Sequence, residues 1–288
     1  MEFPTWAEID IGALKHNVRT TRQIVGSHVK ILLTVKADAY GHGAPYVARA
    51  AVDEGVDMLG VATLHEGIEL RNAGISVPIL VLSPSLKSEI EDLLEYNLIP
   101  TVSDMTFAQA LSQRAKAHSS IAPVHVEVDT GMTRGGVNAD DAVEFIKALR
   151  KLGGIRLEGI YTHFPSSLSE DQEFTIGQME SFRQIVDELR REGIEFDLIH
   201  AANSAAVVEF EESHLNMVRP GGMIYGMLPS REISARGIEP VMTFKSRVVH
   251  IKNAKAGTSV SYGRTYRLVR DTTIAAVAAG YGHGLVRS

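Results

Sequence analysis

The chain has 288 residues, of which 44% are hydrophobic and 22% charged, with a net charge of −6. This composition is typical of a soluble protein with one large domain, or one large and one small, and offers no basic surplus for nucleic acid or anionic membranes. The absence of cysteine excludes disulfides and thiolate chemistry, and we expect no metal site. Neither a signal peptide nor a membrane-spanning run is visible, so a cytoplasmic protein is expected.

Strand-like and helix-like segments alternate through most of the chain. Short apolar runs predict eight strands, at 29–35, 58–63, 78–82, 99–102, 124–129, 157–162, 197–201 and 216–219. Amphipathic stretches lie between them, most clearly at 63–74 and 178–193, and each of these two ends at a glycine. Eight βα units in about 200 residues favour a closed (β/α)₈ barrel over residues 1–236.

The pattern changes after about residue 236. Short β-branched runs, broken by glycines and without helical periodicity, continue to the end of the chain. They predict antiparallel β structure, and we interpret residues 237–288 as part of a C-terminal β domain.

Polar side chains follow five of the predicted strands. In an α/β barrel the carboxyl ends of the strands meet at one rim, where the active sites of such barrels lie. The residues that follow the strands in this way are Lys36, then Glu127 and Asp129 with Arg134 beyond them, then His163, then Asn203 and Ser204, then Arg219 with Gly221 and Gly222. The pattern predicts an active site at this rim.

Each of these residues also has a purely structural interpretation. Lys36 could lie on the surface, His163 could be a buried core residue, and Asn203 could cap a helix. A helix start with a serine and a glycine-rich backbone both suit an anion, however, and an amine held away from water can form an imine. The rim therefore predicts an imine-forming enzyme with a phosphorylated ligand, and leaves open whether the imine forms with a cofactor or with a substrate.

The stretch VKADAYGHG, which begins at Val35, closely resembles the cofactor-lysine motif of the alanine racemases. These are pyridoxal-phosphate enzymes built as an α/β barrel followed by a β domain. Further segments resemble the family in the same order: PTWAEIDIGALKHN, VDTGMTRGGV, GIYTHF, HAANSAA, VRPGGMIYG, VSYGRTY and GYGHGLVR. The resemblance covers essentially the whole chain.

The resemblance implies a role for each matching residue. Lys36 would hold pyridoxal phosphate as an imine and act as one acid/base group, with Tyr262 as the other. Arg219 would face the pyridine nitrogen, with His163 beside the ring, and Arg134 would orient Tyr262 or the substrate carboxylate. The remaining cofactor-binding residues would be Tyr40, Asn203, Ser204, Gly221, Gly222 and Tyr225.

The implied chemistry is racemisation of a small amino acid, alanine by preference. Racemisation removes a proton on one face of the α-carbon and returns one on the other, so two bases must flank that carbon. An arginine at the pyridine nitrogen, which does not readily release its proton, leaves the ring a weaker electron sink than a protonated pyridine. Arg219 therefore favours a racemase over an aminotransferase. The resemblance further implies a homodimer in which Tyr262 acts across the interface.

The chain departs from the family pattern in two places. Where many members have a modified lysine, two residues before Asp129, this chain has Glu127, which we expect to pair with Arg134 without modification. The β domain of the family continues beyond the equivalent of Ser288, so the resemblance implies a C-terminally truncated chain.

Two other functions stay open. One is a barrel that binds pyridoxal phosphate without turnover, which would need neither Tyr262 nor the β segment. The other is a related enzyme of the same barrel family: a decarboxylase, or a racemase of serine, lysine or a broad range of amino acids.

Overall fold

The computed structural model describes residues 3–167, 172–227 and 237–286. Tertiary contacts divide the chain into two units. The larger unit is Ile11–Val241, and the smaller one combines Met1–Asp10 with Met242–Ser288.

The larger unit contains a closed barrel of eight parallel strands, as the sequence predicts. The order around the ring is β2–β3–β4–β5–β6–β8–β9–β10, with β10 pairing back to β2, and the short β7 lies beside β6. The bounds are β2 Lys30–Thr34, β3 Met58–Val61, β4 Ile79–Pro84, β5 Ile99–Val102, β6 Ala122–Asp129, β7 Val137–Asn138, β8 Ile155–Tyr161, β9 Leu198–His200 and β10 Met217–Val218.

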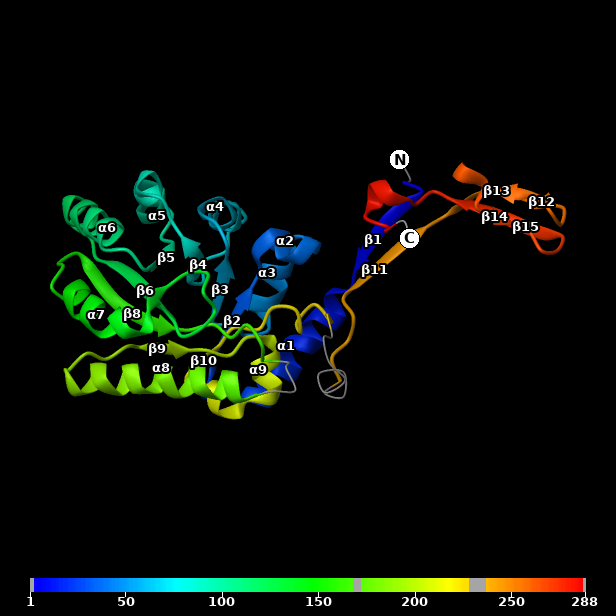
Figure 1. Cartoon of the computed structure of the whole chain (residues 1–288). Helices are drawn as coiled ribbons and strands as arrows, with labels where there is room; N and C mark the ends of the chain where they lie inside the picture. The colour runs from blue at the N-terminus through cyan, green and yellow to red at the C-terminus, as the bar shows by residue number, and fades with distance from the viewer. Residues whose placement is uncertain (1–2, 168–171, 228–236, 287–288) are drawn as a thin grey trace. The chain divides into compact units, whose positions relative to one another are not determined.

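Helices lie along the outside of the strands (Figure 1). They are α1 Ile11–Val25, α2 Lys36–Gly41, α3 Ala44–Asp53, α4 Leu64–Asn72, α5 Ile90–Glu95, α6 Met105–Ala117, α7 Ala142–Arg150, α8 Glu173–Arg191 and α9 Ser204–Glu209. The two clearest predicted helices correspond to α4 and α8. Across the part of the chain that the structure describes, none of the helices combines the length and apolar character needed to cross a bilayer.

The strands are apolar runs because the barrel buries both of their faces. One buried cluster takes a side chain from each of seven strands, namely Leu32, Met58, Leu80, Ile99, Tyr161, Leu198 and Met217. Filling the barrel in this way makes its centre a packed core, so a ligand has room only at the rim.

The smaller unit is antiparallel, as expected. In it β1 Thr5–Ile9 pairs with β11 Met242–Ser246, β12 Val248–Ala254 with β15 Thr272–Val277, and β13 Ser259–Val260 with β14 Tyr266–Arg267. The predicted barrel range of 1–236 includes residues 1–10, whereas the contacts group these residues with the β unit. The reason is the full-length β1–β11 ladder, a long-range pairing that local sequence does not reveal.

Candidate active site

One cavity of about 810 Å³ opens at the carboxyl ends of the barrel strands. Nine of the eleven residues to which the family resemblance gives a role line it: Lys36, Tyr40, Arg134, His163, Asn203, Ser204, Arg219, Gly221 and Gly222. The lining also includes Glu127, Tyr161, Leu82 and Ser167. Residues as far apart in the chain as Lys36 and Gly222 thus meet at one rim, as the barrel geometry predicts.

Lys36 lies two residues beyond the end of β2, immediately before a left-handed turn. The four residues from Ala37 to Tyr40 have φ between 50° and 55°. Left-handed backbone costs about 1–2 kcal/mol for each residue with a Cβ atom, so four in a row need support from their surroundings. This turn brings Lys36 and Tyr40 to the lining of the same cavity.

Hydrogen bonds to side chains hold this turn. Glu66 accepts from the backbone N–H of Ala37 at 2.8 Å and from that of Ala62 at 2.7 Å. Asp38 accepts from the backbone N–H of Ala44 at 2.7 Å. Glu66 also caps α4 in a capping box with Thr63. The Thr-x-x-Glu pattern is visible in the sequence, but its second use, against Ala37, is not.

The far wall of the cavity is built from Ser204 and the glycines after Arg219. Ser204 Oγ accepts from the backbone N–H of Gly221 at 2.9 Å and from that of Met223 at 3.3 Å. A Cβ atom on Gly221 would lie 3.0 Å from the hydroxyl oxygen of Tyr40, so the glycine lets Tyr40 approach closely. Two hydroxyls and a bare backbone therefore converge on one corner of the cavity.

Asn203 and Tyr225 support this wall from behind. Asn203 caps α9 through the N–H groups of Ala205 and Ala206. Tyr225 is buried, and its hydroxyl donates to Thr34 O at 2.8 Å while its ring lies against that of Tyr40 at 5.1 Å. Burial raises the pKa of both tyrosines.

Arg219 is a buried cation at the floor of the cavity, with 5% of its surface exposed. It donates to His200 Nδ1 at 2.8 Å, to Thr162 O at 2.7 Å, to Ala201 O at 3.1 Å and to His163 Nδ1 at 3.3 Å. Burial lowers the pKa of Arg219 to about 10, so the guanidinium stays charged near neutral pH.

His163 is neutral beside this cation. Burial, followed by the charges of Arg219, Arg134 and Lys36, lowers the pKa of His163 to about 3. Its Nδ1 therefore serves as an acceptor for the Arg219 N–H.

The prediction that Glu127 pairs with Arg134 is wrong. Among the described residues no hydrogen bond or ion pair within 4.0 Å joins the two side chains, because Glu127 is buried and Arg134 is exposed. Burial raises the pKa of Glu127, while Arg219 and then Arg134 act to lower it. The negative charge that Glu127 can supply thus acts chiefly on Arg219.

Tyr262 belongs to the smaller unit, where it starts a short 3₁₀ turn at Tyr262–Arg264. Its side chain is 88% exposed there. The cavity described above is formed within the barrel alone, and Tyr262 is not part of it.

Family comparisons agree with this geometry. Residues 9–229 match the model of the alanine racemase N-terminal domain, and residues 241–288 match that of the alanine racemase C-terminal domain. The chain belongs to the alanine racemase family. The two matched ranges together contain every predicted site residue, with Tyr262 in the C-terminal one.

Individual alanine racemases are similar over almost the whole chain. That of Halothermothrix orenii is 45% identical over 285 residues, which cover 99% of this chain and 75% of the relative. That of Desulforamulus reducens is 42% identical, covering 100% and 78%. Among solved structures, the alanine racemase of Clostridium difficile 630 aligns with a TM-score of 0.94 at 38% identity, covering 100% of this chain and 76% of that one. The family activity makes the chain an amino-acid racemase, an isomerase.

Proposed function

We propose that the chain interconverts L- and D-alanine with pyridoxal phosphate, using Lys36 and Tyr262 as its two acid/base groups. In this proposal it acts in the cytoplasm as a homodimer, and Tyr262 of the partner subunit completes the cavity. The observation that supports the proposal most strongly is the cavity itself, because Lys36, the buried Arg219 and a corner of hydroxyls and glycine backbone all line it.

The cavity suits pyridoxal phosphate in size and chemistry. Its volume of about 810 Å³ lies within the range of about 300–1,000 Å³ that is common for cofactor sites. Tyr40, Ser204, Gly221 and Gly222 would hold the phosphate, because they offer hydroxyls and accessible backbone at one corner. When bound, the cofactor supplies an aldehyde that captures amines and a conjugated ring that stabilises negative charge at the α-carbon.

Arg219 would face the ring nitrogen of the cofactor. Its guanidinium is a donor without acceptor capacity, and it is fixed by two backbone carbonyls and two imidazoles. The ring nitrogen would then accept a hydrogen bond without taking a proton, which weakens the ring as an electron sink. The neutral His163 would lie beside the ring without adding a charge.

Lys36 and Tyr262 would move the protons. Lys36 would act on one face of the α-carbon, and the Tyr262 hydroxyl on the other, since inversion needs a proton group on each face. Arg134, exposed at the rim of the cavity, would orient the substrate carboxylate through a charge-assisted hydrogen bond.

Hydrogen exchange tests this function directly. The full chain with pyridoxal phosphate and L-alanine in deuterated water should replace the α-hydrogen with deuterium and form D-alanine, followed by NMR and chiral chromatography. L-serine and L-lysine in the same assay test the other racemases. Cofactor binding without exchange from any of the three would instead support the non-catalytic barrel.

The Tyr262→Phe variant tests the two-base assignment. Because each base serves one enantiomer, loss of the hydroxyl should reduce exchange from one enantiomer far more than from the other, by at least about 100-fold. Equal losses from L- and D-alanine would assign Tyr262 to positioning alone. The matched control is Tyr266→Phe, an exposed tyrosine of the same unit.

A further inference from the structure

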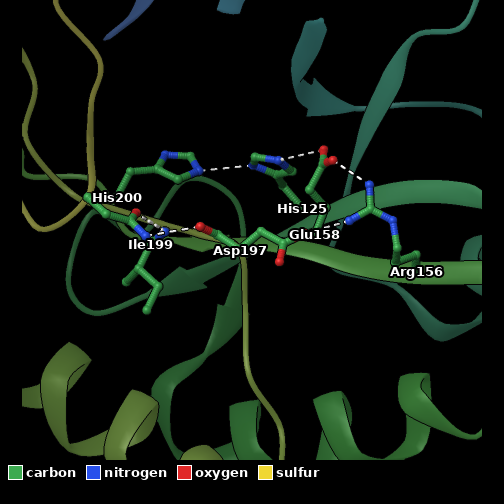
Figure 2. A network of polar contacts seen from close by, with 7 residues as sticks. His125, Arg156, Glu158, Asp197, Ile199 and His200 are labelled. Atoms are coloured by element: carbon green, nitrogen blue, oxygen red, sulfur yellow. Dashed lines mark hydrogen bonds and ion pairs between the residues drawn. The ribbon is translucent and has the colours of Figure 1, made fainter. Parts of the chain in front are cut away.

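A chain of polar side chains leads from Arg219 away from the cavity. Arg219 Nη1 lies 2.8 Å from His200 Nδ1, and His200 Nε2 lies 2.9 Å from His125 Nδ1. His125 Nε2 then lies 3.4 Å from Glu158 Oε2, and Glu158 Oε1 accepts from Arg156 at 2.5 Å. Figure 2 shows these groups in line from His200 to Arg156. Both histidines are 0% exposed.

Two features of strands β6 and β8 make room for this series of side chains. A Cβ atom on Gly159, its neighbour on β8, would lie only 2.5 Å from the imidazole, so only glycine leaves room for the ring. The pairing of β6 with β8 shifts by one residue between Val124 and His125, which leaves Glu158 as the extra residue of a β-bulge. Bulges redirect side chains, and this one brings an otherwise outward-facing carboxylate to His125.

Arg219 determines which nitrogen of each imidazole has the proton. A guanidinium only donates, so His200 Nδ1 must accept, and the proton of a neutral His200 lies on Nε2. That proton is donated to His125 Nδ1, which places the His125 proton on Nε2, facing Glu158. Burial lowers the pKa of both histidines, which keeps them neutral.

Glu158 selects the same arrangement from the other end. At 3.4 Å its contact with His125 is longer than a well-formed hydrogen bond. Both atoms are nevertheless buried, and neither has another hydrogen-bond partner among the described residues. Burial acts to raise the pKa of Glu158, but the hydrogen bonds of His125 and Arg156 lower it overall, so the group is a carboxylate.

We propose that Glu158, which does not line the cavity, is a positioning residue for Arg219 and acts through His125 and His200. The pair of imidazoles has two internally consistent states, with both protons on Nε2 or both on Nδ1. The second state would point an N–H of His200 at the N–H of Arg219. Glu158 disfavours that state and thereby keeps the acceptor that holds Arg219 in place. The inference rests on the proposed function for its catalytic consequence, though not for the proton arrangement.

The proton arrangement can be read without cofactor or substrate. Nitrogen-15 NMR of the full chain should show His125 and His200 as neutral rings protonated on Nε2 near neutral pH. In Glu158→Leu, which removes the acceptor, rings protonated on Nδ1 should appear. Glu158→Gln keeps one acceptor oxygen at the same volume and should give an intermediate result, even if the leucine variant folds poorly.

The catalytic consequence has its own readout. If Arg219 is less firmly held, more turnovers should end in transfer of the amino group to the cofactor, in which the α-carbon is oxidised to the ketone of pyruvate and the cofactor is reduced to its amine. Pyruvate formed per racemisation should rise about tenfold in Glu158→Leu, the usual scale for loss of an outer partner of a site residue. Loss of stability alone would lower both products together and leave this ratio unchanged.

Glu54 provides a matched control. Its side chain is 19% exposed, against 16% for Glu158, and it pairs with Arg19 on the outside of the barrel. Glu54→Leu and Glu54→Gln should leave both the imidazole protons and the pyruvate ratio as in the wild type. Wild-type proton positions and an unchanged ratio in both Glu158 variants would overturn the proposal. A wild-type chain that neither racemises nor binds cofactor would instead refute the proposed function, and the NMR result would still decide the proton arrangement.

Discussion

At the scale of single residues, two buried histidines and one half-buried histidine are linked to Arg219. His163 and His200 contact the guanidinium directly, and His125 contacts His200. Burial lowers the pKa of His125, His163 and His200, so the native chain keeps them neutral. An unfolded histidine takes up a proton below a pH of about 6.5. Below that pH the unfolded state binds protons that the native state does not, so stability is full above it and falls as the pH drops.

This predicts acid sensitivity well above the carboxylate range. Each such histidine should lower the free energy of unfolding by about 1.4 kcal/mol per pH unit below its unfolded pKa. Glu127, whose pKa burial raises, opposes this by at most one proton. Urea unfolding of the wild-type chain at pH 7, 6 and 5 measures the effect. The control is His118→Gln, which removes an exposed histidine and should leave the same dependence of stability on pH. A midpoint that stays constant from pH 7 to 5 would contradict neutral burial.

The site residues at strand ends were predictable from the sequence, whereas the buried side chains that hold them in place were not. Lys36, His163 and Arg219 each follow an apolar run, and a barrel brings such positions together. His125 has the same alternation as Glu127 and could have been noticed as inward-facing. Glu158 could not, because only a register shift between two strands directs it to His125.

At the scale of elements, the left-handed turn after β2 is the least expected piece of structure. Propensity offers no signal for four such residues without glycine, since the conformation is unfavourable for each of them. Its stability comes from tertiary contacts, of which the Glu66 bond to Ala37 is the clearest. The eight strands were predictable because burial of both faces makes them continuous apolar runs, and the helices α4 and α8 because burial of one face imposes a helical period on their residues.

Glu66 should therefore control cofactor affinity from outside the cavity. Glu66→Ala removes the acceptor for the N–H groups of Ala37 and Ala62, which should lower the free energy of unfolding by about 1–3 kcal/mol. The turn that positions Lys36 and Tyr40 should loosen, so titration with pyridoxal phosphate should show about tenfold weaker binding.

A second capping glutamate separates the two effects of Glu66. Glu89 accepts from the N–H of Leu86 at the start of its own helical turn and lies apart from the turn after β2. Glu89→Ala should cost stability and leave cofactor affinity at the wild-type value. Equal affinity for pyridoxal phosphate in Glu66→Ala and Glu89→Ala would show that the hydrogen bonds of Glu66 to Ala37 and Ala62 do not support the site.

At the scale of the whole molecule, the barrel and the β unit divide the proposed chemistry between them. The barrel contains the cavity lined by Lys36, Arg219 and Ser204, and the β unit contains Tyr262. The fold class of each unit was predictable from its sequence pattern. Alternating apolar runs and helical periods indicate the barrel, and short β-branched runs indicate the antiparallel unit. The assignment of residues 1–10 to the β unit was not, because it depends on pairing across more than 230 residues.

The proposed function depends above all on a covalent bond between pyridoxal phosphate and Lys36. Reduction of the full chain loaded with pyridoxal phosphate, using borohydride, followed by digestion and mass spectrometry, locates the attachment. We expect the pyridoxyl phosphate mass on the peptide that contains Lys36, and no such label in Lys36→Ala. A label on another lysine, or an unlabelled Lys36 in a chain that racemises alanine, would contradict the proposed attachment.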